Sequence, residues 1–215
     1  MSVMQTLPAR FFVTGTDTGV GKTHVTAYLL RYYAAQGLRV VGMKPVASGC
    51  EWIDGQWQNE DVARLVAASN VDAPQALINP YRFDPPIAPH IAAAQAGVSI
   101  DLAVIIDAYQ QLAALADVVI VEGAGGLLVP LNASQTMADL MLALELPGLL
   151  VVGMKLGCIN HALLTAEVMR HKGIPCCGWV ANHVDPQMQV QTENLQTLQI
   201  GLHQPPCLQL PYQAH

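Results

Sequence analysis

The nine residues from Gly15 to Thr23, which read Gly-Thr-Asp-Thr-Gly-Val-Gly-Lys-Thr, constrain the fold more than any other part of the chain. They follow the apolar run at residues 11–13 and precede a long stretch with helical spacing. A strand, a glycine-rich turn, a lysine and a hydroxyl at a helix start are typical of phosphate binding, because backbone N–H groups and the positive end of the helix dipole meet the anionic oxygens. Lys22 adds positive charge, and the Thr23 hydroxyl is placed to bind Mg²⁺.

The spacing in this loop differs by one residue from the common phosphate-loop motif. In that motif the first glycine stands five positions before the glycine of Gly-Lys-Thr. Here that position is Thr16, and Gly15 stands six positions before Gly21. A glycine-rich turn without a ligand is the alternative, but Gly-Lys-Thr between a strand and a helix favours a nucleotide-binding loop that is one residue longer.

Composition bounds the remaining possibilities. With 215 residues, 52% hydrophobic and 12% charged, residues 1–215 can form one domain with a large core. The formal net charge of −6 argues against a nucleic-acid partner, whose phosphates require a basic face. The five cysteines are odd in number and show no C-x-x-C spacing, which indicates reduced thiols and a cytoplasmic protein.

No membrane association is expected. Residues 1–10 contain no charged segment followed by an apolar segment, so no secretory signal is predicted. Residues 140–154 are the most apolar stretch, but Glu145 and Pro147 interrupt it and it is too short to span a bilayer.

Apolar runs alternate with helical patterns along the chain, which predicts an α/β fold with a doubly wound, mostly parallel sheet and flanking helices. The strands are expected at residues 10–13, 38–43, 117–122, 148–154, 177–181 and 208–211. Residues 50–58 are expected to form a loop or hairpin and residues 73–89 an irregular loop. We expect Ser99 to cap the helix that follows it, and Asp185 and Pro186 to begin a helix that extends through Leu198.

Three ionisable residues are candidates for a ligand site, and the first of them lies at the edge where ligands collect in open α/β sheets. Lys44 follows the second apolar run and is placed to reach a transferring phosphoryl group, although taken alone it could be an ordinary surface lysine. Asp61 opens a helix, where a carboxylate either complements the helix dipole or holds Mg²⁺, and the spacing favours neither. Glu122 ends a run of four β-branched residues, where an unpaired carboxylate would be costly, so a magnesium-organising role is predicted.

Further polar segments follow later strands. Residues 157–160 precede a helix and present N–H groups that can form a second anion site. Cys158 lacks a visible activating partner, so it is not expected to be a nucleophile. Asn182 and His183 follow another strand on the same edge. His90 is expected to satisfy local backbone groups rather than to contact substrate.

Five segments together resemble the dethiobiotin synthetases, which catalyse the penultimate step of biotin synthesis. They are residues 13–23, 44–49, 121–126, 155–161 and 178–182, in the order in which that family has them and spread over nearly the whole chain. The longer phosphate loop is the form found in that family.

The resemblance implies a seven-stranded or similar parallel sheet, a homodimer and an ATP-dependent cyclo-ligase that forms carbon–nitrogen bonds. In that family 7,8-diaminononanoate takes up CO₂ as a carbamate, ATP phosphorylates the carbamate, and the second amine closes the ring and releases phosphate. ATP is then a co-substrate and Mg²⁺ a cofactor. The protein's part in phosphoryl transfer is positioning and charge stabilisation.

The resemblance also implies residue roles. Lys22 and Lys44 would be catalytic, and Thr23, Asp61 and Glu122 would hold Mg²⁺. The implied nucleotide-binding residues are Gly15, Thr16, Thr18, Gly19, Val20, Gly21, Lys22, Thr23, His24, Asp61, Glu122, Gly123, Ala124, Gly125, Asn182, His183, Pro211, Tyr212 and Gln213. The implied substrate-binding residues are Ser48, Gly157, Cys158, Ile159 and Asn160, the last four receiving the substrate's carboxylate across the dimer interface.

The chain departs from that family's pattern at three places. Many members have an acidic residue where this chain has Gly19, so that side-chain contact is absent here. The position after Asn182 is often aspartate and is His183 here, which affects base preference. The family usually continues with a C-terminal helix, whereas this sequence ends at His215, so we expect looser closure over the nucleotide there.

Two other functions compete with this one. A switch ATPase of the partitioning or metal-cluster-assembly type shares the fold, but such proteins usually carry an additional lysine early in the loop, and none lies between Gly15 and Gly21. A non-catalytic nucleotide-binding protein is disfavoured by the presence of Lys22, Lys44, Asp61 and Glu122 together.

Overall fold

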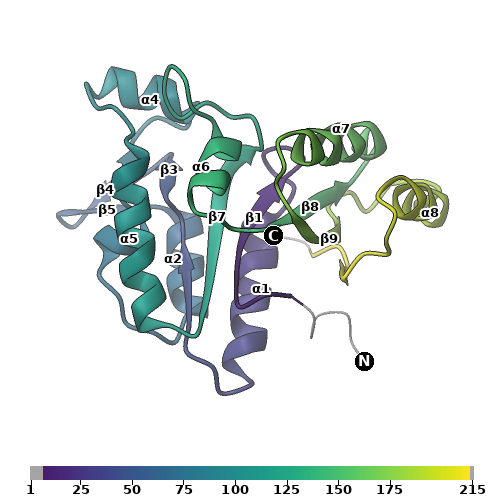
Figure 1. Ribbon diagram of the computed structural model, residues 1–215, viewed down its shortest axis with the longest axis horizontal. Coiled ribbons are helices and arrows are strands. Elements are labelled where there is room, and N and C mark those ends of the chain that lie inside the picture. The colour runs from purple at the N-terminus through teal and green to yellow at the C-terminus, as the bar shows by residue number, and fades with distance from the viewer. Residues whose placement is uncertain (1–6, 214–215) are drawn as a thin grey trace.

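The computed structural model describes residues 7–213 (Figure 1). Its helices are α1 (Lys22–Ala34), α2 (Glu60–Ala68), α3 (Gln75–Ile78), α4 (Pro89–Gln95), α5 (Leu102–Leu115), α6 (Met137–Ala143), α7 (Cys158–His171) and α8 (Gln191–Gly201). Its strands are β1 (Arg10–Gly15), β2 (Val40–Met43), β3 (Val46–Ser48), β4 (Glu51–Ile53), β5 (Gln56–Gln58), β6 (Tyr81–Phe83), β7 (Val118–Gly126), β8 (Gly148–Met154), β9 (Cys176–His183) and β10 (Leu208–Leu210).

The main sheet has six strands in the order β10-β9-β8-β1-β7-β2, and every pairing is parallel. Parallel neighbours need a crossover connection, and helices such as α1 between β1 and β2 supply it. The predicted α/β class is therefore confirmed.

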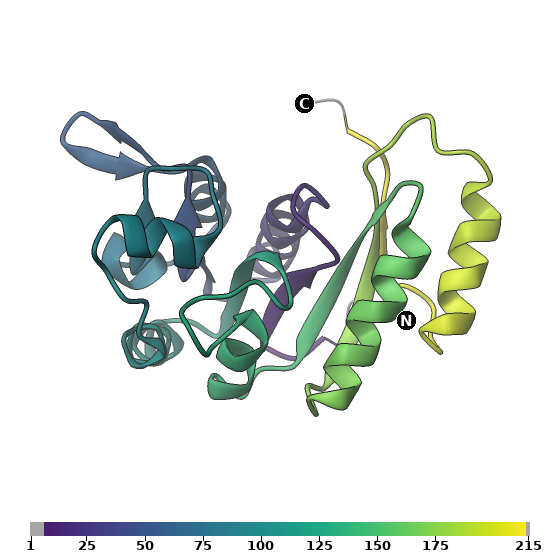
Figure 2. The ribbon, with the colours of Figure 1, turned by 90° about the horizontal axis from the view of Figure 1, so that it is seen from above.

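Helices cover both faces of this sheet, as the view along its edge shows (Figure 2). Along β7, Val118 and Ile120 pack with α1 on one face, whereas Val119 and Val121 pack with α5 and α6 on the other. Successive side chains of a strand point to opposite faces, so a sheet covered twice requires a continuous apolar run rather than alternation. Each fully buried valine or isoleucine contributes roughly 1.5–3 kcal/mol.

The strand order gathers the polar residues that follow each strand. Lys44 follows β2, the phosphate loop follows β1, and Glu122 is the central residue of β7, where it follows four apolar residues. All strands of the sheet run in one direction, so these residues meet at one edge, which is where ligands bind in open α/β sheets.

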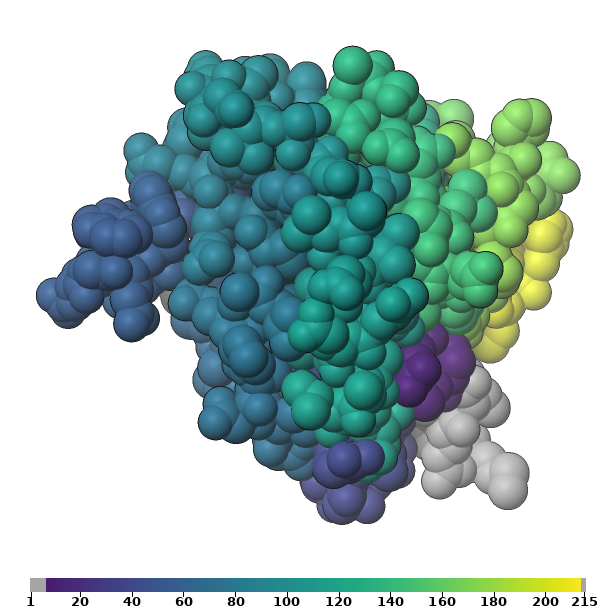
Figure 3. All heavy atoms as spheres, turned by 60° about the vertical axis from the view of Figure 1, so that its left-hand side comes forward, coloured from purple at the N-terminus to yellow at the C-terminus, as the bar shows by residue number. Residues whose placement is uncertain are grey.

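The predicted hairpin at residues 50–58 is formed by β4 and β5, which pair antiparallel. It projects from the body of the protein (Figure 3). Trp52 packs against Trp57 edge to face, with ring centroids 5.2 Å apart, and its side chain is 61% exposed. The two-residue turn at Asp54 and Gly55 has positive φ at both positions, which matches the twist of the strands.

Two predicted helix starts were wrong. Asp101, not Ser99, caps α5, because its side chain accepts from the Ala103 N–H at 2.9 Å. Asp185 accepts from the Gln187 N–H at 2.9 Å and so forms a turn, and α8 begins only at Gln191. In both cases the aspartate bonds the N–H two residues on.

Residues 73–89, predicted to be an irregular loop, contain α3 and β6 instead. β6 pairs with β3 in a second, parallel two-stranded sheet beside the main one. Within residues 7–213 no helix is both long and apolar enough to cross a membrane.

Candidate functional site

The phosphate loop connects β1 to α1, and two of its glycines have left-handed backbone. Gly21 is the residue before α1 and has φ 83°, and a Cβ there would lie 2.1 Å from Nδ2 of Asn182. That Nδ2 donates to the Val20 carbonyl at 2.9 Å, so Asn182 at the end of β9 supports the loop. Gly19 has φ 74°, and no atom of residues 7–213 lies within 4 Å of a Cβ built there, so nothing in that part of the chain fills the space of the family's acidic side chain.

Lys22 is buried in the first turn of α1, and its Nζ donates to the Asp17 carbonyl at 3.0 Å. Burial, together with the nearby charge of Lys44, lowers the pKa of Lys22 to about 8, and the carboxylates of Glu122, Asp61 and Asp17 partly oppose this. The Lys22 ammonium group therefore interacts with the same charged groups that surround Lys44.

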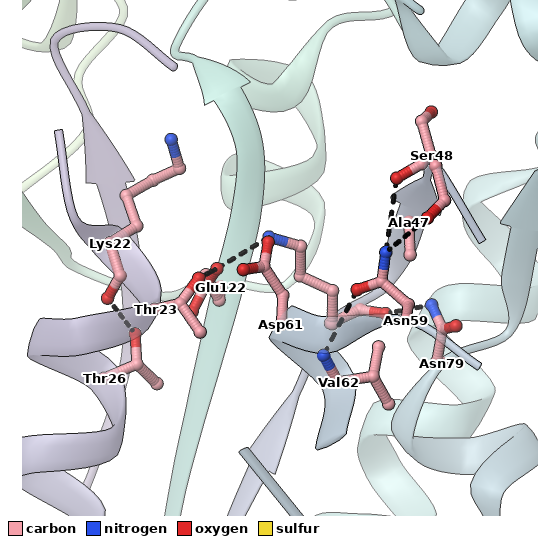
Figure 4. A network of polar contacts seen from close by, with 12 residues as sticks. Lys22, Thr23, Thr26, Ala47, Ser48, Asn59, Asp61, Val62, Asn79 and Glu122 are labelled. Carbon is pink, nitrogen blue, oxygen red and sulfur yellow. Dashed lines mark hydrogen bonds and ion pairs between the residues drawn. The ribbon is translucent and has the colours of Figure 1, made fainter. Parts of the chain in front are cut away.

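Hydrogen bonds connect Thr23, Lys44, Asp61 and Glu122 into one cluster, and Figure 4 labels Thr23, Asp61 and Glu122 within it. Lys44 Nζ donates to Glu122 Oε1 at 2.6 Å and to Asp61 Oδ2 at 2.8 Å. Thr23 Oγ1 donates to the same Glu122 oxygen at 2.7 Å. Residues from α1, β7 and the ends of β2 and α2 thus meet at the edge predicted from the sequence.

Charge pairing decides the protonation of this cluster. Burial alone would lower the pKa of Lys44, but the Glu122 and Asp61 carboxylates outweigh it and hold this pKa above its usual value. Burial alone would raise the pKa of Asp61, but Lys44 and neighbouring donors bring it below its usual value. Lys44 is therefore a cation and Asp61 an anion at neutral pH.

The cluster fits a magnesium ion. Mg²⁺ prefers oxygen ligands and is usually held by one or two carboxylates together with phosphates and water. Thr23, Asp61 and Glu122 supply a hydroxyl and two carboxylates, and Glu122 Oε2 is buried without a hydrogen-bond partner among the described residues. An acceptor with this geometry suits a cation.

Ser48 lies at the end of β3, beyond Lys44. Its Oγ is buried and has no hydrogen-bond partner among residues 7–213, so its hydrogen-bonding capacity is unused there. His90 at the start of α4 was predicted to satisfy local backbone groups, yet its Nδ1 is also buried without a hydrogen-bond partner in that part of the chain.

A cavity of about 450 Å³ lies beyond Asn182 at the carboxyl ends of β9 and β10. His183, Pro211 and Tyr212 line it, together with Asp185, Pro186, Gln191, Gln209 and Leu210. Three of the residues expected near the nucleotide base therefore surround one cavity, whereas Gln213 is exposed and does not line it.

The N-terminus of α7 adjoins the phosphate loop. Gly157 precedes the helix with φ 94° and no side-chain cap. The Cys158 N–H donates to the Lys155 carbonyl at 3.0 Å and its side chain is buried, which leaves the N–H groups of Ile159 and Asn160 as the helix donors without an intrahelical acceptor. Lys155 Nζ lies 3.9 Å from Asp17 Oδ2 of the loop.

The remaining predicted residues flank this centre. Residues 123–125 continue β7 beside β1, where Gly126 pairs with Gly15 after an irregularity in register. Thr16 lines a second cavity, of about 430 Å³, between the loop and α7. The Thr18 N–H donates to Asp17 Oδ1 at 2.7 Å, and His24 is half-buried in the first turn of α1.

Sequence reasoning missed residues that act through the backbone. Asn79 is buried, and its Nδ2 donates to the Lys44 carbonyl at 2.6 Å and to the Tyr81 carbonyl at 3.1 Å. Asn59 links the Ser48 segment to α2. Asparagine just before a helix is a recognised capping signal, but nothing in the spacing reveals the distant carbonyls.

Comparison with known proteins identifies the family. The model of an AAA domain family matches residues 9–214. A curated ATP-dependent dethiobiotin synthetase from Nitrosospira multiformis is 58% identical over 202 residues, which is 94% of this chain and 88% of the relative. The chain belongs to the dethiobiotin synthetase family.

Solved structures resemble the fold at low identity. A ParA family ATPase from Chlorobium tepidum has a TM-score of 0.58 at 14% identity, covering 96% of this chain and 86% of that one. The MinD cell division protein of Aquifex aeolicus has a TM-score of 0.58 at 13% identity, covering 95% and 82%. These likenesses support the phosphate-loop ATPase fold of a dethiobiotin synthetase and say nothing about its reaction.

Proposed function

We propose that this enzyme closes the ureido ring of dethiobiotin from 7,8-diaminononanoate, CO₂ and ATP, with ADP and phosphate as the other products. The observation that carries the proposal is the position of Lys44 Nζ, 2.6 Å from Glu122 Oε1 and 2.8 Å from Asp61 Oδ2, beside the phosphate loop. A buried cation at that place is suited to stabilise a transferring phosphoryl group.

The reaction balances in three steps. One amine of the substrate attacks CO₂, a carbon–nitrogen bond forms and a proton leaves, giving a carbamate. A carbamate oxygen attacks the γ-phosphorus of ATP, and ADP departs. The second amine attacks the carbamate carbon, the carbon–oxygen bond to phosphate breaks, and the ring closes with loss of a second proton.

The two lysines would supply most of the charge stabilisation. Lys22 lies on the phosphate loop and Lys44 faces it from the end of β2, so both would interact with the γ-phosphoryl oxygens as negative charge shifts during transfer. Such preorganised donors are worth about 3–4 kcal/mol each in comparable sites. Ser48 Oγ, buried and without a partner among the described residues, would receive the diamine or carbamate.

Thr23, Asp61 and Glu122 would hold Mg²⁺. When bound, the ion would neutralise phosphate charge and orient the γ-phosphoryl group. Glu122 would keep Lys44 and Thr23 aligned through the oxygen that both already contact.

The substrate carboxylate would bind at the N-terminus of α7, where the helix dipole favours an anion. The donors there would be backbone groups of Ile159 and Asn160. We further propose a homodimer in which this end of α7 serves the partner's site. Support comes from Leu164 and Leu128, which line the cavity beside α7 and are 58% and 51% exposed, and from Leu156, which precedes α7 and is 97% exposed.

The base of ATP would lie in the cavity lined by His183, Pro211 and Tyr212, next to Asn182. Because Asn182 Nδ2 already donates to the Val20 carbonyl, its other amide groups would read the base. A cytoplasmic location is supported by five free cysteines.

One assay tests the reaction. The protein is incubated with ATP, Mg²⁺, bicarbonate and 7,8-diaminononanoate, and phosphate release and the product mass are followed. Phosphate release should require the diamine and should match the ring-closed product one to one. Release at the same rate without the diamine would contradict the proposal and favour a switch ATPase.

A further inference from the structure

Asn59 stands between two parts of the site that come from different segments of the chain. Ser48 and Gly49 precede the projecting hairpin β4–β5, and Asp61 follows it in the first turn of α2. We propose that Asn59 is a positioning residue that holds the Ser48 segment against the end of α2 that carries Asp61. The proposal rests on the ring-closing function proposed above.

The two halves of the Asn59 amide make different contacts (Figure 4). Its Nδ2 donates to the Ser48 carbonyl at 3.2 Å and to the Gly49 carbonyl at 3.4 Å. Its Oδ1 accepts from the Val62 N–H at 3.2 Å and so caps α2. One half of the side chain therefore stabilises the helix, and the other half connects that helix to the substrate segment.

The Asn59 contacts link the two sides of the site. Asp61 pairs with Lys44, and Lys44 Nζ also contacts Glu122. On the opposite side, the Gly49 N–H donates to the Pro85 carbonyl at 3.3 Å and the Cys50 N–H to the Phe83 carbonyl at 2.9 Å. Asn59 ties that substrate-side backbone to α2, so Ser48 Oγ and the Asp61 carboxylate keep a fixed relation.

The hairpin itself does not fix this relation. Its strands are exposed apart from half-buried Trp57, and the chain leaves at Cys50 and returns at Asn59. Rotation of the Ser48 segment would leave the hairpin intact but would misplace the substrate relative to ATP, and small misplacements of that kind are costly in turnover.

Two substitutions separate the tether from the cap. Asn59→Ser and Asn59→Asp both keep a good helix-capping oxygen and both remove the amide donor. One variant is neutral and the other is charged, so an effect common to both reports the loss of the donor. We expect kcat/KM for the diamine to fall about tenfold in both variants, with ATP affinity within about twofold of wild type.

Asn70 provides the matched control beyond the C-terminus of α2. Its Oδ1 accepts from the Val40 N–H at 2.7 Å and its Nδ2 donates to the Leu38 carbonyl at 2.8 Å, so it bridges two backbone groups in the same way. Asn70→Ser and Asn70→Asp should lower the melting temperature and leave kcat/KM for the diamine unchanged. Asn59→Ala, which loses both contacts, should combine the kinetic loss with a lower melting temperature.

Kinetics of wild type and the four serine and aspartate variants decide the matter. A diamine-specific loss confined to the Asn59 variants supports the inference. Overturning results are a kcat/KM for the diamine that stays at the wild-type value in both Asn59 variants, or an equal loss of ATP affinity. Phosphate release by the wild-type protein that does not depend on the diamine would instead contradict the proposed function. Failure of the proposed function and failure of the Asn59 proposal are therefore distinguishable.

Discussion

Replacing Lys44 by methionine removes one charge from the centre of the site at nearly constant side-chain length. Lys44 is 4% exposed and lies between Glu122, which is fully buried, and Asp61, whose side chain is 43% exposed. The two lysines and two carboxylates of the cluster, Lys22 included, sum to zero charge, and the variant leaves a net charge of −1.

The cost follows from the burial of Glu122. Removing one partner of a buried ion pair costs about 3–5 kcal/mol, because the other charge stays behind unpaired. Asp61 can be solvated once Lys44 is gone, so we take about 3 kcal/mol, from Glu122 alone. For a chain of this length each kcal/mol lowers the melting temperature by about 2–4 °C, which gives a drop of about 6–12 °C.

Thermal melts in EDTA and in Mg²⁺ measure this effect, and phosphate release measures turnover. Mg²⁺ should raise the melting temperature of Lys44→Met more than that of wild type, since a divalent cation offsets the new negative charge. Turnover should fall about 10²–10³-fold while ATP still binds. The control is Lys172→Met, which breaks the half-exposed Lys172–Asp139 pair and should cost under about 1 kcal/mol with full activity.

Either of two results would refute the reasoning about Lys44. A melting temperature in EDTA within 2 °C of wild type, as a margin of about 1 kcal/mol, would mean that Glu122 is not a buried partner of Lys44. An unchanged kcat would remove Lys44 from the catalytic residues.

Three more changes give distinct outcomes. Asn160→Trp should raise KM for the diamine at least tenfold more than KM for ATP, and equal increases would mean that the α7 anion site is misassigned. Gly21→Ala should fold yet lose ATP binding in titration calorimetry, because its φ of 83° and the contact with Asn182 exclude a Cβ; full affinity would contradict this. Burial raises the pKa of Cys177 to about 12 and of Cys207 to about 11, so these two thiols should react with iodoacetamide at pH 8.5 roughly a hundredfold more slowly in native than in unfolded protein, as peptide mapping would measure. The folded thiols keep protons that the unfolded chain releases, so the free energy of unfolding should fall above pH 9, and less so in the double Cys→Ala variant.

The central part of the site could be predicted because it obeys a local rule. Lys44 directly follows the apolar run of β2, and Glu122 directly follows the apolar run of β7. Parallel strands bring such positions to one edge whatever the order of the strands, so neighbours in space could be inferred without knowing the topology. For Asp61 the spacing favoured neither of two roles, and only the family resemblance implied a place in the same site.

The supporting hydrogen bonds from asparagine side chains to distant carbonyls could not be predicted, because no repeating pattern in the sequence marks them. Asn79 reaches the carbonyl of Lys44 35 residues away, and Asn182 reaches Val20 across 162 residues. Each of these hydrogen bonds depends on which backbone carbonyls are left without a backbone partner once the chain has folded. The start of α8 was predicted wrongly for a related reason. The Asp185 side chain accepts from the Gln187 N–H and closes a turn, and the chain becomes helical only at Gln191.

The hairpin β4–β5 leaves the body of the protein at Cys50 and rejoins it at Asn59. The Cys50 backbone donates to the Phe83 carbonyl, and the Asn59 side chain donates to the Ser48 and Gly49 carbonyls. Apart from half-buried Trp57, the residues of its strands are exposed, and a tight turn at Asp54 and Gly55 forms its tip. Such a loop tip tolerates grafted sequence. A peptide tag or fluorophore inserted between Asp54 and Gly55 would sit beside the Trp52–Trp57 pair, and the indole emission would report on its arrangement while the chemistry below proceeds undisturbed.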